Sequence, residues 1–200
     1  YPLKLLVVFF HESSHALATV LTGGTVQAMV IMPEQGGHVI SVGGNRFLTL
    51  SAGYLGSLVW GMVIYLVAAT THRDKTTMMV LGVCVVGIAL VYMRNLFGLA
   101  FCGMTGLGMV GVGWLLNREV NDFLLRVIGL TSMMYAPLDI YSDTILRADL
   151  RSDARMLAEE FGGATTTWGG LWMVMSILAV WYSLRWSLRT EPSKSHPEVE

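Results

Sequence analysis

The chain has 200 residues, of which 54% are hydrophobic and only 14% are charged. An average soluble domain carries about 25% charged residues, and the deficit here comes from long apolar segments. The formal net charge of −1 excludes a basic nucleic-acid-binding protein, so we expect no nucleic-acid partner. The composition predicts an all-α, polytopic, integral membrane protein that lies in a lipid bilayer.

Six segments are apolar enough to form membrane spans, each of which needs about 20 residues. They are predicted at 2–22, 47–70, 77–93, 96–116, 123–141 and 166–186. Arg126 and Pro137 are expected to break the fifth segment, because a charge is costly in lipid and proline interrupts a helix. The chain starts at Tyr1 with its first segment already under way, which predicts an N-terminally truncated fragment.

Residues 1–190 are expected to form a single membrane-embedded domain. The segment 191–200 contains two prolines and several charges, and it is predicted to be a disordered polar tail. Residues 147–162 carry a mixture of basic and acidic side chains in a helix-compatible pattern. This segment is interpreted as a solvated connector before the last span.

A β-hairpin is predicted between the first two spans. Thr25–Met32 and His38–Val42 are rich in β-branched and apolar residues, and the intervening residues 33–37 supply a turn. Bare strand edges cannot face lipid, so the hairpin should lie at the interface or in a protein-lined cavity. One interpretation is that its edge binds an extended substrate by strand addition. The other is that it merely connects the two spans.

The first apolar segment contains the sequence His11-Glu12-Ser13-Ser14-His15. Histidines four positions apart lie on one face of a helix, so both imidazoles can bind one metal ion. Glu12 can then act as a general base toward a water molecule. Ionisable groups in an apolar helix need partners, and a metal ion is the simplest one for these three side chains. The motif therefore predicts a zinc site with Glu12 as a catalytic residue.

Catalytic zinc commonly has three protein ligands, so a third ligand must come from another segment. Asp139 directly follows an apolar run and has no cation four residues away, which favours it as the third metal ligand. Asp143 has an i,i+4 ion-pair partner in Arg147. Asp143 is kept as an alternative ligand, or as a carboxylate that orients a ligating histidine.

The other histidines and the two cysteines are expected mainly to have no catalytic or metal-binding role. His38 flanks the predicted turn and is either a turn residue or a group near the site. His72 and His196 lie in polar surroundings and are expected to be solvated. Cys84 and Cys102 lie in apolar segments, which favours packing over a disulfide or a zinc pair.

The chain resembles the site-2 protease family of intramembrane zinc metallopeptidases, in particular its "B-like" branch. The matching motifs are His11–His15, Ser51–Ser57 and Pro137-Leu138-Asp139, and the hairpin fits the family layout. The resemblance covers most of residues 5–160. It implies that His11, His15 and Asp139 bind zinc and that Glu12 activates water.

The chain also departs from the family motifs. Ile140 follows Leu138-Asp139 where the family usually has glycine, and Ala136 replaces the common asparagine before the proline. The second-span motif lacks the usual proline and asparagine but keeps Gly53 and Gly56, which suit close helix packing.

The leading hypothesis is an intramembrane zinc metalloendopeptidase that hydrolyses peptide bonds of a membrane-protein or peptide substrate. The alternative, motivated by the departures, is a non-catalytic zinc-binding membrane scaffold with the same fold. A di-iron oxygenase would need more histidines than the five present. A transporter would be expected to show an internal repeat, and no convincing repeat is visible.

Overall fold

The computed structural model describes residues 1–148 and 150–190. The expected tail at 191–200 lies outside these residues. The elements follow in the order α1 (Pro2–Leu21), β1 (Thr25–Ile31), β2 (Gly37–Val42), α2 (Arg46–Thr70), α3 (Asp74–Tyr92), α4 (Leu96–Leu115), α5 (Arg118–Tyr141), the π-helix η1 (Ser142–Leu146), α6 (Asp153–Phe161) and α7 (Thr165–Thr190). The predicted helical class is therefore confirmed, together with the hairpin between the first two helices.

The chain is a multi-pass integral membrane protein. Among the described residues, five helical segments are long and apolar enough to cross a membrane: α2, α3, α4, α5 joined to η1, and α7. The first predicted span, at 2–22, forms the helix α1 but does not reach the same mean hydropathy. Lys4 and the polar run from His11 to His15 lower its hydropathy. Most of α1 is instead buried against protein.

The predicted break in the fifth segment is wrong. Helix α5 runs without interruption from Arg118 to Tyr141 and continues into η1. Arg126 pairs with Asp122 one turn earlier, at 3.0 Å, so its charge has a partner. Pro137 lies near the end of the helix, where the loss of one backbone hydrogen bond is tolerated because packed neighbours support the remaining turns.

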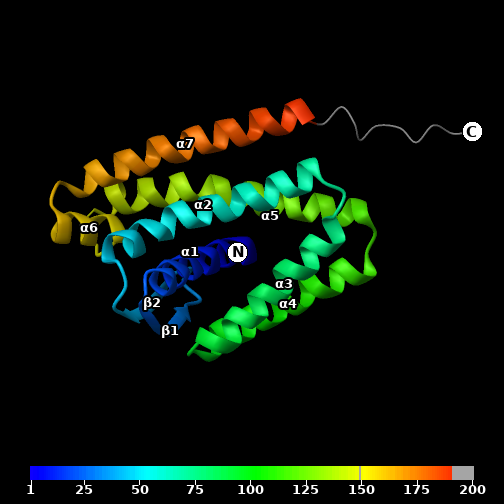
Figure 1. Ribbon diagram of the computed structural model, residues 1–200, viewed down its shortest axis with the longest axis horizontal. Helices are drawn as coiled ribbons and strands as arrows, with labels where there is room; N and C mark the ends of the chain where they lie inside the picture. Colours follow the sequence, from blue (N-terminus) through cyan, green and yellow to red (C-terminus); the bar gives the residue numbers. More distant parts are fainter. Residues whose placement is uncertain (149, 191–200) are drawn as a thin grey trace, which may run out of the picture.

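The helices are arranged in layers (Figure 1). Helix α7 lies above α2 and α5, whereas α1 and the hairpin lie on the other side of α2. The helices α3 and α4 pack against each other as a pair beside α1. Gly61 of α2 and Gly129 of α5 lie backbone to backbone, and a Cβ atom on either one would meet the other's carbonyl oxygen. Small residues thus set the close approach of these two helices.

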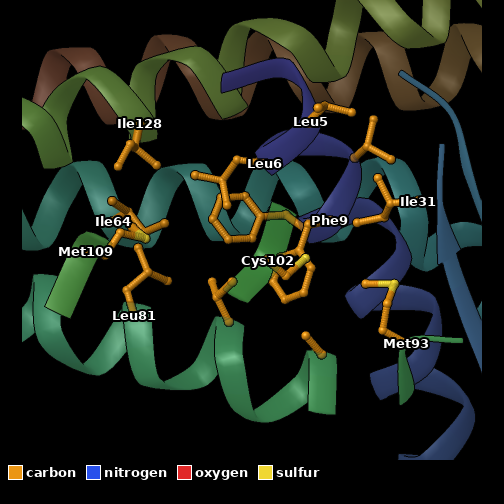
Figure 2. Packing of buried hydrophobic residues seen from close by; sticks show 14 of the residues in the cluster. Leu5, Leu6, Phe9, Ile31, Ile64, Leu81, Met93, Cys102, Met109 and Ile128 are labelled. Carbon is orange, nitrogen blue, oxygen red and sulfur yellow. The ribbon is translucent and has the colours of Figure 1, made fainter. Parts of the chain in front are cut away.

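The main core surrounds the first half of α1 (Figure 2). Leu5, Leu6 and Phe9 pack there with apolar side chains from β1 and from α2, α3, α4 and α5. Both cysteines are free thiols. Cys102 is fully buried in this core, in agreement with its predicted packing role, whereas Cys84 is exposed on α3 and lacks the packing role predicted for it. The core fixes α1 as the central element of the fold, so its histidines are held on a well-packed helix.

The two strands of the hairpin pair antiparallel, from Thr25 opposite Val42 to Ile31 opposite Gly37. The outer edge of β1 is covered: the backbone N–H of Arg94 donates to the Met29 carbonyl at 3.0 Å. The Asn95 side chain also donates to the Ile31 carbonyl at 2.6 Å. Among the described residues, β2 pairs with no strand other than β1. The outer edge of β2 is therefore the edge that remains available for pairing.

Candidate metal centre

The two histidines of α1 converge as their spacing predicts. The Nε2 atoms of His11 and His15 lie 3.0 Å apart, and the two rings pack edge to face. His15 is buried, and the side chain of His11 is 20% exposed. Both imidazoles therefore converge on one point, which is largely buried but remains accessible through the exposed part of His11.

A carboxylate from a distant segment completes the group. Oδ2 of Asp153, the first residue of α6, lies 3.1 Å from Nε2 of His11 and 3.1 Å from Nε2 of His15. Across residues 1–148 and 150–190, these three side chains are the one group of at least three possible ligands close enough to hold a metal ion.

The hydrogen-bonding chemistry of the three side chains fits a bound cation. Nδ1 of His15 donates to the carbonyl oxygen of Thr49 at 2.6 Å, so in the neutral imidazole Nε2 carries a lone pair. That lone pair faces the Asp153 carboxylate, which also offers only lone pairs when ionised. A cation between them, either a proton on His15 or a metal ion, removes this conflict. A backbone carbonyl that holds the second ring nitrogen is the usual arrangement of a metal-ligating histidine.

The separations of the ligand atoms also fit a tetrahedral ion. Ligand atoms about 2.0–2.1 Å from a tetrahedral zinc ion lie about 3.3 Å from one another. The three separations found here are 3.0, 3.1 and 3.1 Å. The three atoms thus form a triangle close to one face of such a tetrahedron. Three protein ligands leave one position for water or substrate.

Asp153 is held in its ionised form. Burial raises the pKa of its carboxyl group, but the charge of His15 in its protonated form and the hydrogen bonds with His11 and His15 outweigh this effect. The pKa of Asp153 therefore lies well below its usual range. An ionised carboxylate is the form that binds a metal ion.

Helix α6 brings Asp153 to the histidines, so the interpretation of this segment as a solvated connector is wrong. The Ser152 side chain caps the helix by accepting from the backbone N–H of Arg155 at 3.3 Å. Ala154 and Leu157 are fully buried against α2, α5 and α7. The helix lies beside the first turns of α2 (Figure 1), where Glu160 pairs with Arg46 at 3.0 Å.

Three glycines make room for the centre. A Cβ atom on Gly53 of α2 would meet Nε2 of both histidines, and one on Gly37 of β2 would meet the Glu12 carboxylate at 2.8 Å. A Cβ atom on Gly56 would meet the side chain of Ser14 even more closely. The motif at Ser51–Ser57 thus provides the close packing of α2 on α1 that its small residues predict.

Glu12 is buried beside the two histidines, with 5% of its surface exposed. It lies at the junction of two cavities, of about 470 and 290 Å³. The larger cavity contains the three candidate ligands and the β2 residues from Gly37 to Val39 and Ser41. The smaller one extends toward Lys4 and Arg147. Residues that line both cavities are His11, Glu12, Gly37, Tyr54 and Asp143.

Asp139 and Asp143, the two acidic residues predicted as alternative ligands, line the smaller cavity together with His11. Asp139 lines the smaller cavity and interacts electrostatically with His11 and Lys4, but it is not a member of the three-ligand group. Asp143 pairs with Arg147 at 2.6 Å, which confirms the predicted ion pair. Its other oxygen accepts a hydrogen bond from the Tyr54 hydroxyl at 2.6 Å.

Of the remaining histidines in the described residues, His38 lies at the larger cavity and His72 does not line either cavity. His38 is exposed on β2 and lines the larger cavity. His72 is exposed beside α3 and contacts the side chain of Arg118. His196 lies outside the described residues.

Asp153 is the candidate ligand that the sequence interpretation missed. The signal was present in the sequence: Ser152 is a typical N-cap residue, and the apolar residues Ala154 and Leu157 follow at helical spacing. Together they indicate a short helix with one face packed on protein. Asp153 lies outside the apolar spans, in a segment whose mixed charges are typical of a solvated connector.

The comparisons with known proteins point to one family. No curated protein and no solved structure matches the chain. Residues 1–183 match the family described as Peptidase M50B-like, within the site-2 protease family, and the chain belongs to this family.

Proposed function

We propose that the protein is a zinc metallopeptidase that hydrolyses peptide bonds of membrane-associated substrates. The observation that carries the proposal is the position of Glu12, which is buried beside the group formed by His11, His15 and Asp153 and borders both cavities. Membership in the Peptidase M50B-like family supports a metallopeptidase-type function in the membrane.

We further propose Asp153 as the third ligand in place of Asp139. Its Oδ2 atom lies 3.1 Å from each histidine Nε2 atom, whereas Asp139 lines the neighbouring cavity. Zinc in this site would polarise the substrate carbonyl and lower the pKa of a water molecule to about 7. Glu12 accepts the proton of the attacking water and returns it to the leaving amine.

The outer edge of β2 is proposed to bind the substrate as an added strand. The edge of β1 is occupied by Arg94 and Asn95, whereas β2 contributes residues to the wall of the larger cavity. An extended peptide paired with β2 would gain backbone hydrogen bonds and pass close to Glu12. This arrangement favours the substrate-binding interpretation of the hairpin over a simple connection.

The test of the proposal is the variant Glu12→Gln, purified in detergent and compared with the wild type on membrane-protein substrates. The amide cannot accept the proton of water, so cleavage is expected to fall by about 10²–10⁴-fold. Because Glu12 is not a proposed ligand, the variant should retain the wild-type zinc content. Metal analysis of the same samples provides this control.

Unchanged cleavage by Glu12→Gln would contradict the proposed function. A wild-type protein that binds zinc but cleaves no membrane substrate would instead favour the non-catalytic scaffold. A wild-type protein purified with iron would favour the oxygenase.

A further inference from the structure

The two histidines of the proposed metal site are held in different ways. His15 is fixed by the hydrogen bond from its Nδ1 atom to the Thr49 carbonyl. Within the part of the chain that the structure describes, Nδ1 of His11 makes no such bond. The His11 ring instead packs edge to face against Tyr54, with ring centroids 4.9 Å apart and an interplanar angle of 81°.

Tyr54 is itself held in place by burial, by a ring contact and by a hydrogen bond of its hydroxyl group. It is 2% exposed, and its ring also packs on Trp172 of α7 with centroids 5.3 Å apart. Its hydroxyl donates to Oδ2 of Asp143 at 2.6 Å. Oδ1 of the same carboxylate accepts from the Arg147 guanidinium, also at 2.6 Å. A continuous series of contacts therefore runs from Arg147 through Asp143 and Tyr54 to the His11 ring.

We infer, on the basis of the proposed metal site, that Tyr54 is a positioning residue that orients His11 for metal binding, and that Asp143 acts through it. A ligating histidine needs a partner that fixes the orientation of its ring, and loss of such a partner typically costs 10–100-fold in metal affinity. Tyr54 supplies this role by ring packing, and Asp143 keeps the tyrosine ring in place. Asp143 thus orients a ligand without contacting it.

The experiment measures the zinc affinity of the full chain in detergent by competition with a chelator. Tyr54→Phe keeps the ring but removes the hydrogen bond, and its affinity is expected to fall by about 10-fold. Tyr54→Leu also removes the ring packing, and its affinity should fall by about 100-fold. The visible absorption of the Co²⁺-loaded Tyr54→Phe protein should shift, because the His11 ring changes its orientation at the ion.

Tyr65→Phe is the matched control. Tyr65 lies on the same helix α2, is 8% exposed and is hydrogen-bonded to Ser187 at 3.1 Å, remote from the histidines. The variant Tyr65→Phe also loses a buried hydroxyl, but its zinc affinity and its Co²⁺ spectrum should be unchanged. This control separates an effect on the metal site from a general loss of packing.

A double-mutant cycle tests whether Asp143 acts through Tyr54. Asp143→Ala should lose as much affinity as Tyr54→Phe, and the double variant should lose no more, because both remove one hydrogen bond. Asp143→Asn keeps an acceptor oxygen for the hydroxyl and should restore most of the affinity. Additive losses would show that Asp143 acts independently of Tyr54 and would overturn the inference.

Two further results have distinct meanings. Wild-type zinc affinity in Tyr54→Phe, whether or not Tyr54→Leu is impaired, would overturn this inference and leave the proposed function intact. A wild-type protein that binds neither zinc nor Co²⁺ would overturn both.

Discussion

At the scale of single residues, Gly53 sets the space for the metal centre. A Cβ atom at this position would meet Nε2 of both His11 and His15, the atoms proposed to bind zinc. The His15 imidazole cannot move away without losing its hydrogen bond to the Thr49 carbonyl. Glycine at position 53 is therefore required by the close approach of α2 to the ligand atoms, whatever its effect on helix stability.

Gly53→Ala is expected to lower zinc affinity by at least about 10-fold while the helical fold remains, because the added methyl group displaces the ligand atoms. Chelator competition measures the affinity, and circular dichroism monitors the fold. Gly103→Ala on α4 is the control, since a Cβ atom there meets nothing within 4 Å. Equal affinities of the two variants would refute the role assigned to Gly53.

At the scale of elements, α6 couples packing to metal binding. The helix has only nine residues, and its position depends on its contacts with α2, α7 and η1. Ala154 and Leu157 lie in a buried cluster with Leu50, Tyr54 and Trp172. Asp153 is the first residue of this helix, so the packing of Leu157 four positions later helps to fix the carboxylate.

Leu157→Ala should therefore impair both stability and zinc binding. Removal of a fully buried leucine side chain costs about 2–5 kcal/mol and loosens α6 on its neighbours. We expect zinc affinity to fall, but by less than in Asp153→Ala, which removes the carboxylate itself. Leu171→Ala is a control on α7, where the side chain is 53% exposed. A destabilised Leu157→Ala protein with wild-type zinc affinity would show that α6 holds Asp153 by other contacts.

At the scale of the whole molecule, the crossing of α2 and α5 supports the arrangement of the centre. Helix α2 contributes Gly53 and Tyr54, and α5 leads directly into η1, which carries Asp143. The two helices meet closely at Gly61 and Gly129, where backbone faces backbone. The crossing therefore fixes the distance between two walls of the cavities.

Gly61→Ala is expected to destabilise the folded protein by about 1–3 kcal/mol, because a methyl group there meets the backbone of α5. Unfolding in mixed detergent measures the effect. Gly87→Ala on α3 is the control, since nothing lies within 4 Å of its Cβ position and alanine favours a helix by about 1 kcal/mol over glycine. A Gly61→Ala protein as stable as Gly87→Ala would contradict the close crossing.

Local patterns explain which features were predictable from the sequence. The hairpin, the convergence of His11 and His15 and the ion pair of Asp143 with Arg147 each depend on residues close in sequence, and all three are found. The placement of Asp153 depends instead on how α6 folds back against α2, although the 82 residues 71–152 separate the two helices in the sequence. No spacing rule encodes that contact.

The prediction of a broken fifth span failed for a related reason. The local cost of proline and arginine predicts a break, whereas Asp122 and the packing around α5 compensate for that cost in the folded protein. The composition of the charged segment after η1 likewise predicts a solvated connector. Its two buried apolar residues, Ala154 and Leu157, determine its position more than its charges do.

The most direct test of the central claim is the zinc stoichiometry of purified wild-type protein and of three variants, Asp153→Ala, Asp139→Ala and Asp143→Ala. A three-ligand site of His11, His15 and Asp153 predicts about one zinc ion per wild-type chain, because the three atoms define a single tetrahedral site. It further predicts loss of bound zinc in Asp153→Ala and its retention in Asp139→Ala, with a lowered affinity in Asp143→Ala. Full zinc occupancy in Asp153→Ala together with its loss in Asp139→Ala would contradict the account and assign the third ligand to Asp139.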